Sequence, residues 1–130
     1  MRWILPVLAA TLLNLTAEKA HDPPRMPVVV QSDPNLDACF GVGVVKGLNS
    51  NHEGFLAVRG GPGIGFAPID KLHNNERVYL CMESGDWYGI VYTKTGQECN
   101  VSTPWVRPLP YKGPCRSGWV HKRWIELLAG

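Results

Sequence analysis

The segment Phe55–Gly63, which reads Phe-Leu-Ala-Val-Arg-Gly-Gly-Pro-Gly, constrains the fold more than any other part of the chain. Leu56 and Val58 alternate with Ala57 and Arg59, which predicts a short strand with one buried face. The strand must end at the Gly-Gly-Pro-Gly run, because proline has no backbone N–H and glycine admits the positive φ angles of tight turns. We therefore predict a half-buried strand followed by a long, tightly turned loop.

Length and composition agree with one small, turn-rich β domain. The 130 residues leave room for a single domain and an export segment, and a hydrophobic content of 45% argues against disorder. Fourteen glycines and eleven prolines, with few runs of helical period, favour an all-β fold. The net charge is +2, and +1 once the single charge of Arg2 is removed. This is too close to neutral for a nucleic-acid-binding surface, so no nucleic-acid partner is expected.

Residues 1–17 are predicted to be an export signal. Arg2 supplies a positive charge, and the apolar run Trp3–Leu15 is shorter than the roughly 20 residues that span a bilayer. Cleavage after Ala17 is favoured, because cleavage after Ala20 would put Glu18 where a small residue is needed. A retained amphipathic helix is the alternative. We therefore expect a periplasmic or secreted protein with no stable membrane insertion after cleavage.

Residues 18–38 are predicted to be a proline-rich linker, and residues 39–130 the folded domain. The Val28-Val29-Val30 run could dock on a sheet edge, but we expect it to act as a tether. Alternating apolar residues predict five strands, over residues 41–47, 55–59, 78–82, 87–92 and 118–121. Residues 60–75 are expected to form a loop, and the chain after residue 121 a turn and an apolar tail. Five short strands cannot leave long edges open, so a small closed barrel is expected.

The order of four motifs resembles that of bacterial Src-homology-3 (SH3-like) domains. Phe55–Gly63 is similar to the family's opening strand and Gly-Pro turn, and Val78–Met82 to its valine-rich strand. Gly85–Tyr92 resembles its Gly-x-Trp-Tyr-x-Val strand, and Gly118–His121 its closing Gly-Trp-Val, which is followed by the aromatic-aliphatic pair Trp124-Ile125. The resemblance implies an all-β, SH3-like five-stranded barrel.

The resemblance covers about residues 40–92 and 116–126, so it leaves out a long insertion at residues 93–117. In the family the fourth and fifth strands are usually joined by a few residues. The four cysteines are also outside the general pattern, although the chain is similar to small secreted proteobacterial proteins that carry a cysteine-bearing version of the domain. Bacterial domains of this family often target cell walls, which implies a binding role.

Four cysteines in a short chain behind an export signal predict two disulfides. Three pairings are possible. We favour Cys99 with Cys115, which closes the insertion on itself and leaves Cys39 with Cys81. Alternation places Cys81 opposite Leu80, on the side facing away from the core, where a segment laid over the barrel could reach it. No Cys-x-x-Cys pair and no histidine at ligand spacing supports a metal site, so neither a metal nor a cofactor is expected.

No residue pattern indicates catalysis. The four histidines are scattered, and none lies beside a cysteine or serine in a recognisable nucleophile motif. The run Gly60–Gly65 lacks the Lys-Ser/Thr pair and the following helix of a phosphate-binding loop. We therefore expect a protein that is not an enzyme.

Aromatic residues are the candidates for ligand binding. Trp87 lies opposite Ile90 in its strand, and the loop after the second strand would bring Phe66 close to it at a shallow groove. Trp105 and Tyr111 of the insertion are expected nearby. Aromatic side chains give a large contact area at a low cost in conformational entropy. Packing is the alternative for Phe66 and Trp87, and four other aromatic residues are expected to fill the core: Tyr88, Tyr92, Trp119 and Trp124.

These features predict an exported, monomeric binding module that recognises cell-wall peptide or glycan. A protein-interaction subunit or inhibitor of another envelope protein is the alternative, because both kinds of groove use the same aromatic residues. A modest basic patch near the insertion could contact an anionic wall polymer or an acidic partner, and it comprises Lys112, Arg116, Lys122 and Arg123.

Overall fold

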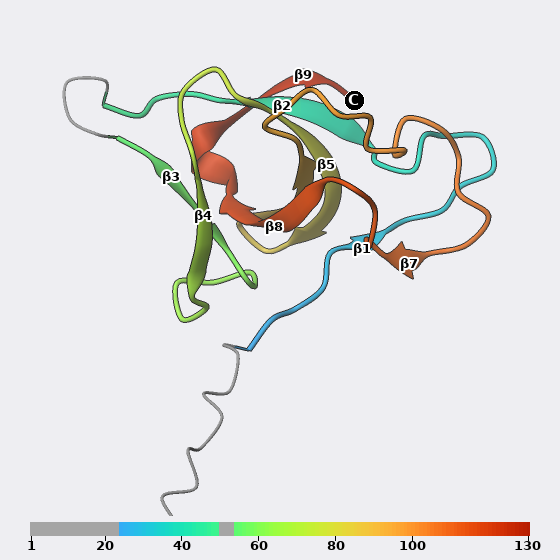
Figure 1. Ribbon diagram of the computed structural model, residues 1–130, viewed down its shortest axis with the longest axis horizontal. Helices are drawn as coiled ribbons and strands as arrows, with labels where there is room; N and C mark the ends of the chain where they lie inside the picture. Colours follow the sequence, from blue (N-terminus) through green and yellow to red (C-terminus); the bar gives the residue numbers. More distant parts are fainter. Residues whose placement is uncertain (1–23, 50–53) are drawn as a thin grey trace, which may run out of the picture.

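The computed structural model describes residues 24–49 and 54–130, and the predicted export signal lies outside these ranges. The described chain is all-β, with nine strands and one short 3-10 helix, η1 (Lys122–Trp124). A seven-stranded and a two-stranded sheet, both antiparallel, contain these strands (Figure 1). Within the described ranges, no helix has the length and apolar character needed to cross a membrane.

The large sheet curls strongly, so that its central strands surround the viewing axis in Figure 1. Its spatial order is β4 (Pro68–Leu72), β3 (Leu56–Arg59), β8 (Arg116–His121), β6 (Trp87–Tyr92), β5 (Arg77–Ser84), β2 (Gly41–Val45) and β9 (Ile125–Ala129). The small sheet pairs β1 (Val29–Val30) with β7 (Leu109–Pro110).

The five predicted strands are present as β2, β3, β5, β6 and β8, which confirms the all-β prediction. The prediction of a closed five-stranded barrel is wrong, because the large sheet has seven strands and is open between β4 and β9. β4 lies in the segment expected to be a loop, and its Pro68, Asp70 and Lys71 hide the strand pattern. An edge strand needs only one hydrogen-bonded neighbour, so it tolerates such residues. The expected apolar tail forms β9, which pairs with β2.

One hydrophobic cluster, here called the inner core, fills the concave side of the sheet. In β3, Leu56 and Val58 are buried in it, whereas Ala57 and Arg59 are only partly covered, as the alternation predicts. The buried members are Val45, Leu56, Val58, Leu72, Val78, Leu80, Ile90, Tyr92 and Val120. Two of the aromatic residues expected in the core, Tyr88 and Trp124, are only partly buried and pack at its margin.

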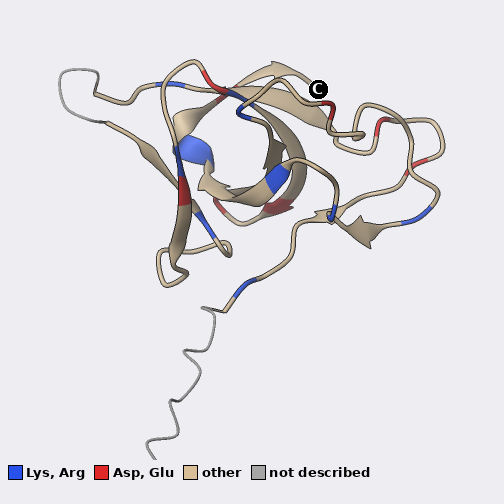
Figure 2. Cartoon of the chain, viewed as in Figure 1, with Lys and Arg blue, Asp and Glu red and all other residues tan. Residues whose placement is uncertain are grey.

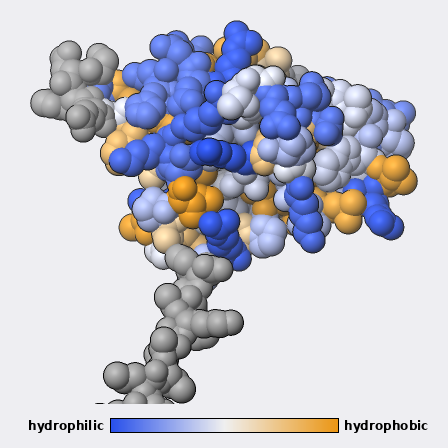
Figure 3. Space-filling model, viewed as in Figure 1, coloured by the Kyte–Doolittle hydropathy of each residue, from blue (hydrophilic) through white to orange (hydrophobic). Residues whose placement is uncertain are grey.

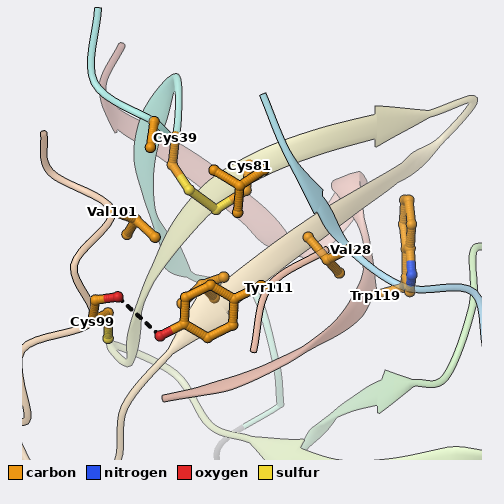
Figure 4. Packing of buried hydrophobic residues seen from close by; sticks show 10 residues of the cluster. Val28, Cys39, Cys81, Cys99, Val101, Tyr111 and Trp119 are labelled. Atoms are coloured by element: carbon orange, nitrogen blue, oxygen red, sulfur yellow. Dashed lines mark hydrogen bonds between the residues drawn. A yellow bond between two sulfur atoms is a disulfide. The ribbon is translucent and has the colours of Figure 1, made fainter. Parts of the chain in front are cut away.

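A second cluster, here called the outer core, lies on the opposite face of β5, β6 and β8 (Figure 4). Consecutive residues in these strands alternate between the two clusters, and Val91 contributes to the outer core while Ile90 contributes to the inner one. Its buried members are Val28, Val30, Ala38, Cys39, Cys81, Val91, Cys99, Val101, Tyr111 and Trp119. The N-terminal segment and the insertion therefore form a second layer over the sheet.

The C-terminal part of the predicted linker is packed and does not act as a free tether. Val28 and Val30 are buried in the outer core. The Trp119 indole N–H donates to the Met26 carbonyl at 2.8 Å, and the Tyr111 backbone N–H donates to the Val28 carbonyl at 2.9 Å. Trp119 points away from the inner core. Without the N-terminal segment, its large apolar ring would be exposed on the outer face of the sheet.

Both favoured disulfides are present. Cys39 is bonded to Cys81 with an S–S distance of 2.01 Å, and Cys99 to Cys115 with one of 2.03 Å. Cys81 faces the outer core, away from Leu80, as strand alternation predicts. The first disulfide ties the segment before β2 to β5, and the second closes the insertion.

Candidate binding groove

A groove of about 350 Å³ lies between β3, the loop that follows it, the start of β6 and η1. We call it the aromatic groove. Its lining includes the aromatic and charged residues Phe55, Arg59, Trp87, His121, Arg123 and Trp124, and the aliphatic residues Leu48, Leu56, Ala57 and Ile64. Its residues come from four separate stretches of the chain, so the groove exists only in the folded protein.

Strand alternation explains one wall of the groove. Leu56 and Val58 point into the inner core, so Ala57 and Arg59 point to the other side of β3. Phe55 precedes the strand with the same parity and is partly exposed. The short strand therefore presents an aromatic ring and a guanidinium on the side that its neighbours leave open.

Trp87 is fixed at the opposite wall by its neighbours. It pairs with His121 across β6 and β8, and the two rings meet edge to face with centroids 5.4 Å apart. One side of the Trp87 ring packs against the outer core, so Trp87 is half-buried. His121 in turn accepts a hydrogen bond at Nδ1 from the Arg123 backbone N–H at 3.0 Å, which caps η1 and positions Trp124.

Cations surround the aromatic rings of the groove. The Arg123 guanidinium lies over the Trp124 ring at 4.9 Å, and Lys71 Nζ lies over the Phe55 ring at 4.3 Å. Such cation–π contacts hold a charged group over a ring face while its other donors stay available. The groove residues given above include two arginines and no carboxylate. The arrangement therefore favours a ligand that combines an apolar group with a negative charge.

Arg59 also has a structural role. Its Nη1 donates to the Phe66 carbonyl at 3.0 Å and lies 3.4 Å from the Ile64 carbonyl. These contacts hold the Gly-rich loop against β3. Phe66 itself is not among the groove residues, because its ring folds back over Gly61, where a Cβ would lie only 2.4 Å from the ring. The prediction that Phe66 lies at the groove is therefore wrong, because Phe66 packs within its own loop.

Trp105 and Tyr111 lie together within the insertion and do not line the groove. Their rings are stacked with centroids 6.3 Å apart. The Trp105 indole N–H donates to the Asn100 carbonyl at 2.8 Å, and the buried Tyr111 hydroxyl donates to the Cys99 carbonyl at 2.9 Å (Figure 4). The same hydroxyl accepts from the Cys115 backbone N–H at 3.2 Å. Of the four predicted ligand-binding residues, only Trp87 lies in the groove.

The tip of the insertion is exposed and apolar. Val106 is fully exposed and Leu109 is 41% exposed, and with Pro104, Trp105 and Arg107 they line a shallow hollow. Figure 3 shows hydrophobic residues beside hydrophilic ones at the end of the molecule that carries β7. The tip is thus held on a base that a disulfide and several hydrogen bonds fix.

The predicted basic patch is divided in the folded protein. Arg116 pairs with Asp70 at 2.9 Å, and Lys122 Nζ lies 3.6 Å from a Glu83 carboxylate oxygen. Only Arg123 of the four residues lines the groove. Figure 2 shows positive and negative residues interspersed over the chain. Of the predicted basic patch, only Arg123 can therefore contact a ligand in the groove.

Asp70 is the centre of a polar network that links β4 to β6 and β8. Its carboxylate accepts from the Tyr92 hydroxyl at 2.7 Å and from Arg116 at 2.9 Å. Burial of the carboxyl by itself raises the pKa of Asp70, but the hydrogen bonds from Tyr92, the Lys71 backbone N–H and Arg116 lower it by more, so the pKa of Asp70 lies below its usual value. Burial and the bond to Asp70 raise the pKa of Tyr92, so its phenol stays protonated.

Sequence reasoning missed several groove residues although part of the signal was present. The alternation that buries Leu56 and Val58 also places Phe55 and Arg59 on the opposite side. Trp124 lines the groove and is only partly buried, because η1 turns it toward β3, which its local sequence does not reveal. In the parts of the chain that the structure describes, no three His, Cys, Asp or Glu side chains come close enough to hold a metal ion.

Comparisons with protein-family models, with curated proteins and with solved structures give no significant match.

Proposed function

We propose that the protein is an exported, non-catalytic binding module with an SH3-like fold that recognises cell-wall peptide or glycan through the aromatic groove. One observation carries this proposal. The groove combines a half-buried tryptophan and two further aromatic rings with Arg59 and Arg123, and its lining includes no carboxylate. Such a surface suits a ligand with both apolar and anionic groups.

The charge of the groove favours wall peptide over glycan. Neutral sugars are recognised through their hydroxyl groups, whereas free carboxylates are recognised by guanidinium groups, which form charge-assisted hydrogen bonds. The Arg123 guanidinium lies over the Trp124 ring, so part of its conformational entropy is already lost before a ligand binds. The short peptides of bacterial walls carry free carboxylates and small apolar side chains, which match this groove.

The disulfides support the expected location. Two disulfides in a small domain indicate an oxidising, extracytoplasmic compartment. We propose that this compartment is the periplasm or the exterior of the cell, where wall polymer is accessible.

Sedimentation with purified peptidoglycan tests the proposal. The mature, oxidised protein is expected to pellet with the polymer, and Trp87→Ala is expected to stay in the supernatant. Trp105→Ala is the matched control, because it removes a partly buried tryptophan that lies outside the groove. Wild-type protein that stays in the supernatant, or equal losses in both variants, would contradict groove binding.

Salt dependence separates the aromatic from the charged contribution. Arg123→Gln should weaken pelleting by about tenfold and flatten its dependence on salt, since it removes one charge-assisted contact. Pelleting that occurs only at low salt and survives Trp87→Ala would indicate non-specific attraction and would count against the proposed groove.

A protein partner is the second candidate, and the insertion tip favours it. Val106 is fully exposed on a base fixed by the Cys99–Cys115 disulfide, so little flexibility is lost when a partner binds. If this tip is the functional surface, a partner from envelope extract should co-purify with wild type and with Trp87→Ala, and be lost with Val106→Asp. The two candidates therefore predict opposite responses to the same pair of variants.

A further inference from the structure

The four tryptophans that the structure describes form two pairs that differ in the hydrogen bonding of their indole N–H groups. The Trp105 and Trp119 indole N–H groups each donate to a backbone carbonyl at 2.8 Å. Within the described ranges, the indole N–H groups of Trp87 and Trp124 donate to no protein acceptor, and both residues line the aromatic groove. A buried indole N–H usually has a hydrogen-bond partner, so these two half-buried donors are available to a ligand.

His121 supplies a third donor to the groove. Its Nδ1 accepts a hydrogen bond from the Arg123 backbone N–H at 3.0 Å. A neutral imidazole carries one N–H, so this bond places the proton on Nε2 and makes Nε2 a donor. Arg59 and Arg123 add guanidinium groups, which donate and cannot accept. The polar side chains among the described lining residues therefore offer a ligand donors alone.

We propose that the aromatic groove selects the free carboxylate at the end of a peptide and discriminates against the corresponding carboxamide. The inference rests on the groove being the binding site proposed above. A carboxylate only accepts hydrogen bonds, so it can pair with several of these donors at once, and its charge complements the two arginines. A carboxamide has no charge, and its two N–H donors would face the donors of the groove.

The apolar part of the lining favours a peptide end over a sugar or polyol phosphate. Leu48, Ala57 and Ile64 lie among the groove residues, and a C-terminal amino acid carries its side chain on the carbon atom next to its carboxylate. Sugar and polyol phosphates also present anionic acceptors, but their hydroxyl groups donate as well and need acceptors in return. An internal peptide segment has the same disadvantage, because its backbone N–H groups need acceptors.

Chemically modified peptidoglycan tests this selectivity. Amidation converts the carboxylates of the purified polymer to carboxamides, and methylation converts them to esters, which are neutral but carry no N–H. The mature, oxidised protein should sediment with the unmodified polymer, about tenfold more weakly with the amidated one, and to an intermediate extent with the ester. Equal binding to unmodified and amidated polymer would overturn this inference and leave the proposed function intact, whereas binding to none of the three would contradict the proposed function itself. Equal losses with ester and amide would show that charge alone is read, and would overturn the role of the neutral donors.

Two variants test the donors individually. His121→Asn removes the Nε2–H but keeps an acceptor for the Arg123 backbone N–H, because an asparagine oxygen is also a favoured helix cap. Trp124→Phe removes an indole N–H and keeps an aromatic ring. Each should lower the ratio of binding to unmodified and amidated polymer severalfold, and a loss of folding would not change this ratio because it weakens both interactions alike. Trp105→Phe is the matched control outside the groove and should leave the ratio unchanged. An unchanged ratio in both groove variants would overturn the proposal.

Discussion

Trp119 and Val120 are consecutive in β8 and both fully buried, yet they belong to different hydrophobic clusters. Val120 lies in the inner core, which the curled sheet forms by itself. Trp119 lies in the outer core, which exists only because the N-terminal segment and the insertion cover that face of the sheet. The N-terminal segment and the insertion, which lie outside the five predicted strands, are thus needed to bury a residue of the last of those strands.

The first prediction concerns the N-terminal cover. Val30→Ala should lower the free energy of unfolding by about 2 kcal/mol, because it removes two buried methyl groups and leaves a cavity beside the outer core. Val29→Ala is the matched control in the same strand, and its partly exposed side chain should contribute less than about 1 kcal/mol. Urea denaturation measures both, and equal effects would mean that residue 30 does not pack as described.

The second prediction concerns the disulfides. The chain-entropy model gives about 3 kcal/mol for the loop closed by Cys99 and Cys115, and about 4 kcal/mol for the longer loop closed by Cys39 and Cys81. Replacing both cysteines of a pair by serine should therefore cost less stability for Cys99 and Cys115 than for Cys39 and Cys81. The Cys39→Ser/Cys81→Ser variant should lose more than the loop term, since it buries two hydroxyls. A larger loss for the insertion pair would contradict the ranking.

The strand pattern could be predicted from sequence wherever a strand has one buried and one open face. β3 and β5 have such a face, and their alternation was sufficient. β4 and β9 could not be predicted in the same way, because an edge strand is constrained on one side only and its sequence reads as loop or tail. β4 and β9 are the two edges of the open sheet. A prediction that includes only the other five strands therefore cannot exclude a closed barrel.

The site was less accessible to sequence reasoning than the fold. Trp87 could be placed in the groove because alternation turns it away from Ile90. Tyr111 could not be excluded, because its burial depends on hydrogen bonds to Cys99 and Cys115 that form only when the insertion folds. Composition shows that a chain has aromatic residues to expose, but tertiary packing decides which of them remain exposed.

The third prediction concerns pH. Hydrogen bonds hold the pKa of Asp70 below its usual value in the folded protein, so the ionised carboxylate stabilises the fold at every pH above that usual value. This stabilisation should be lost as the pH falls through the lowered pKa. The stability difference between wild type and Asp70→Asn should therefore be constant near neutral pH and shrink below about pH 4, as measured by thermal unfolding at each pH.

Tyr92→Phe provides an independent check of the same network. It removes one hydrogen bond to the carboxylate, so the pKa of Asp70 should rise toward its usual value and acid unfolding should begin at a higher pH. The loss of a hydrogen bond to a charged group should cost about 1.5–3 kcal/mol near neutral pH. An unchanged acid midpoint would show that Tyr92 does not determine the pKa of Asp70.

The fourth prediction concerns the close approach of β3 and β8. At Gly118 an added Cβ would lie 2.4 Å from a Val58 methyl group and 3.1 Å from the Arg59 carbonyl oxygen. Gly118→Ala should therefore force the two strands apart and destabilise the protein by roughly 1–3 kcal/mol, the usual cost of overpacking a core. Gly65→Ala is the control, since nothing lies within 4 Å of its added Cβ. Because Arg59 lies at this contact, only Gly118→Ala should also weaken binding at the groove, and a neutral Gly118→Ala would mean that β3 is not held against β8.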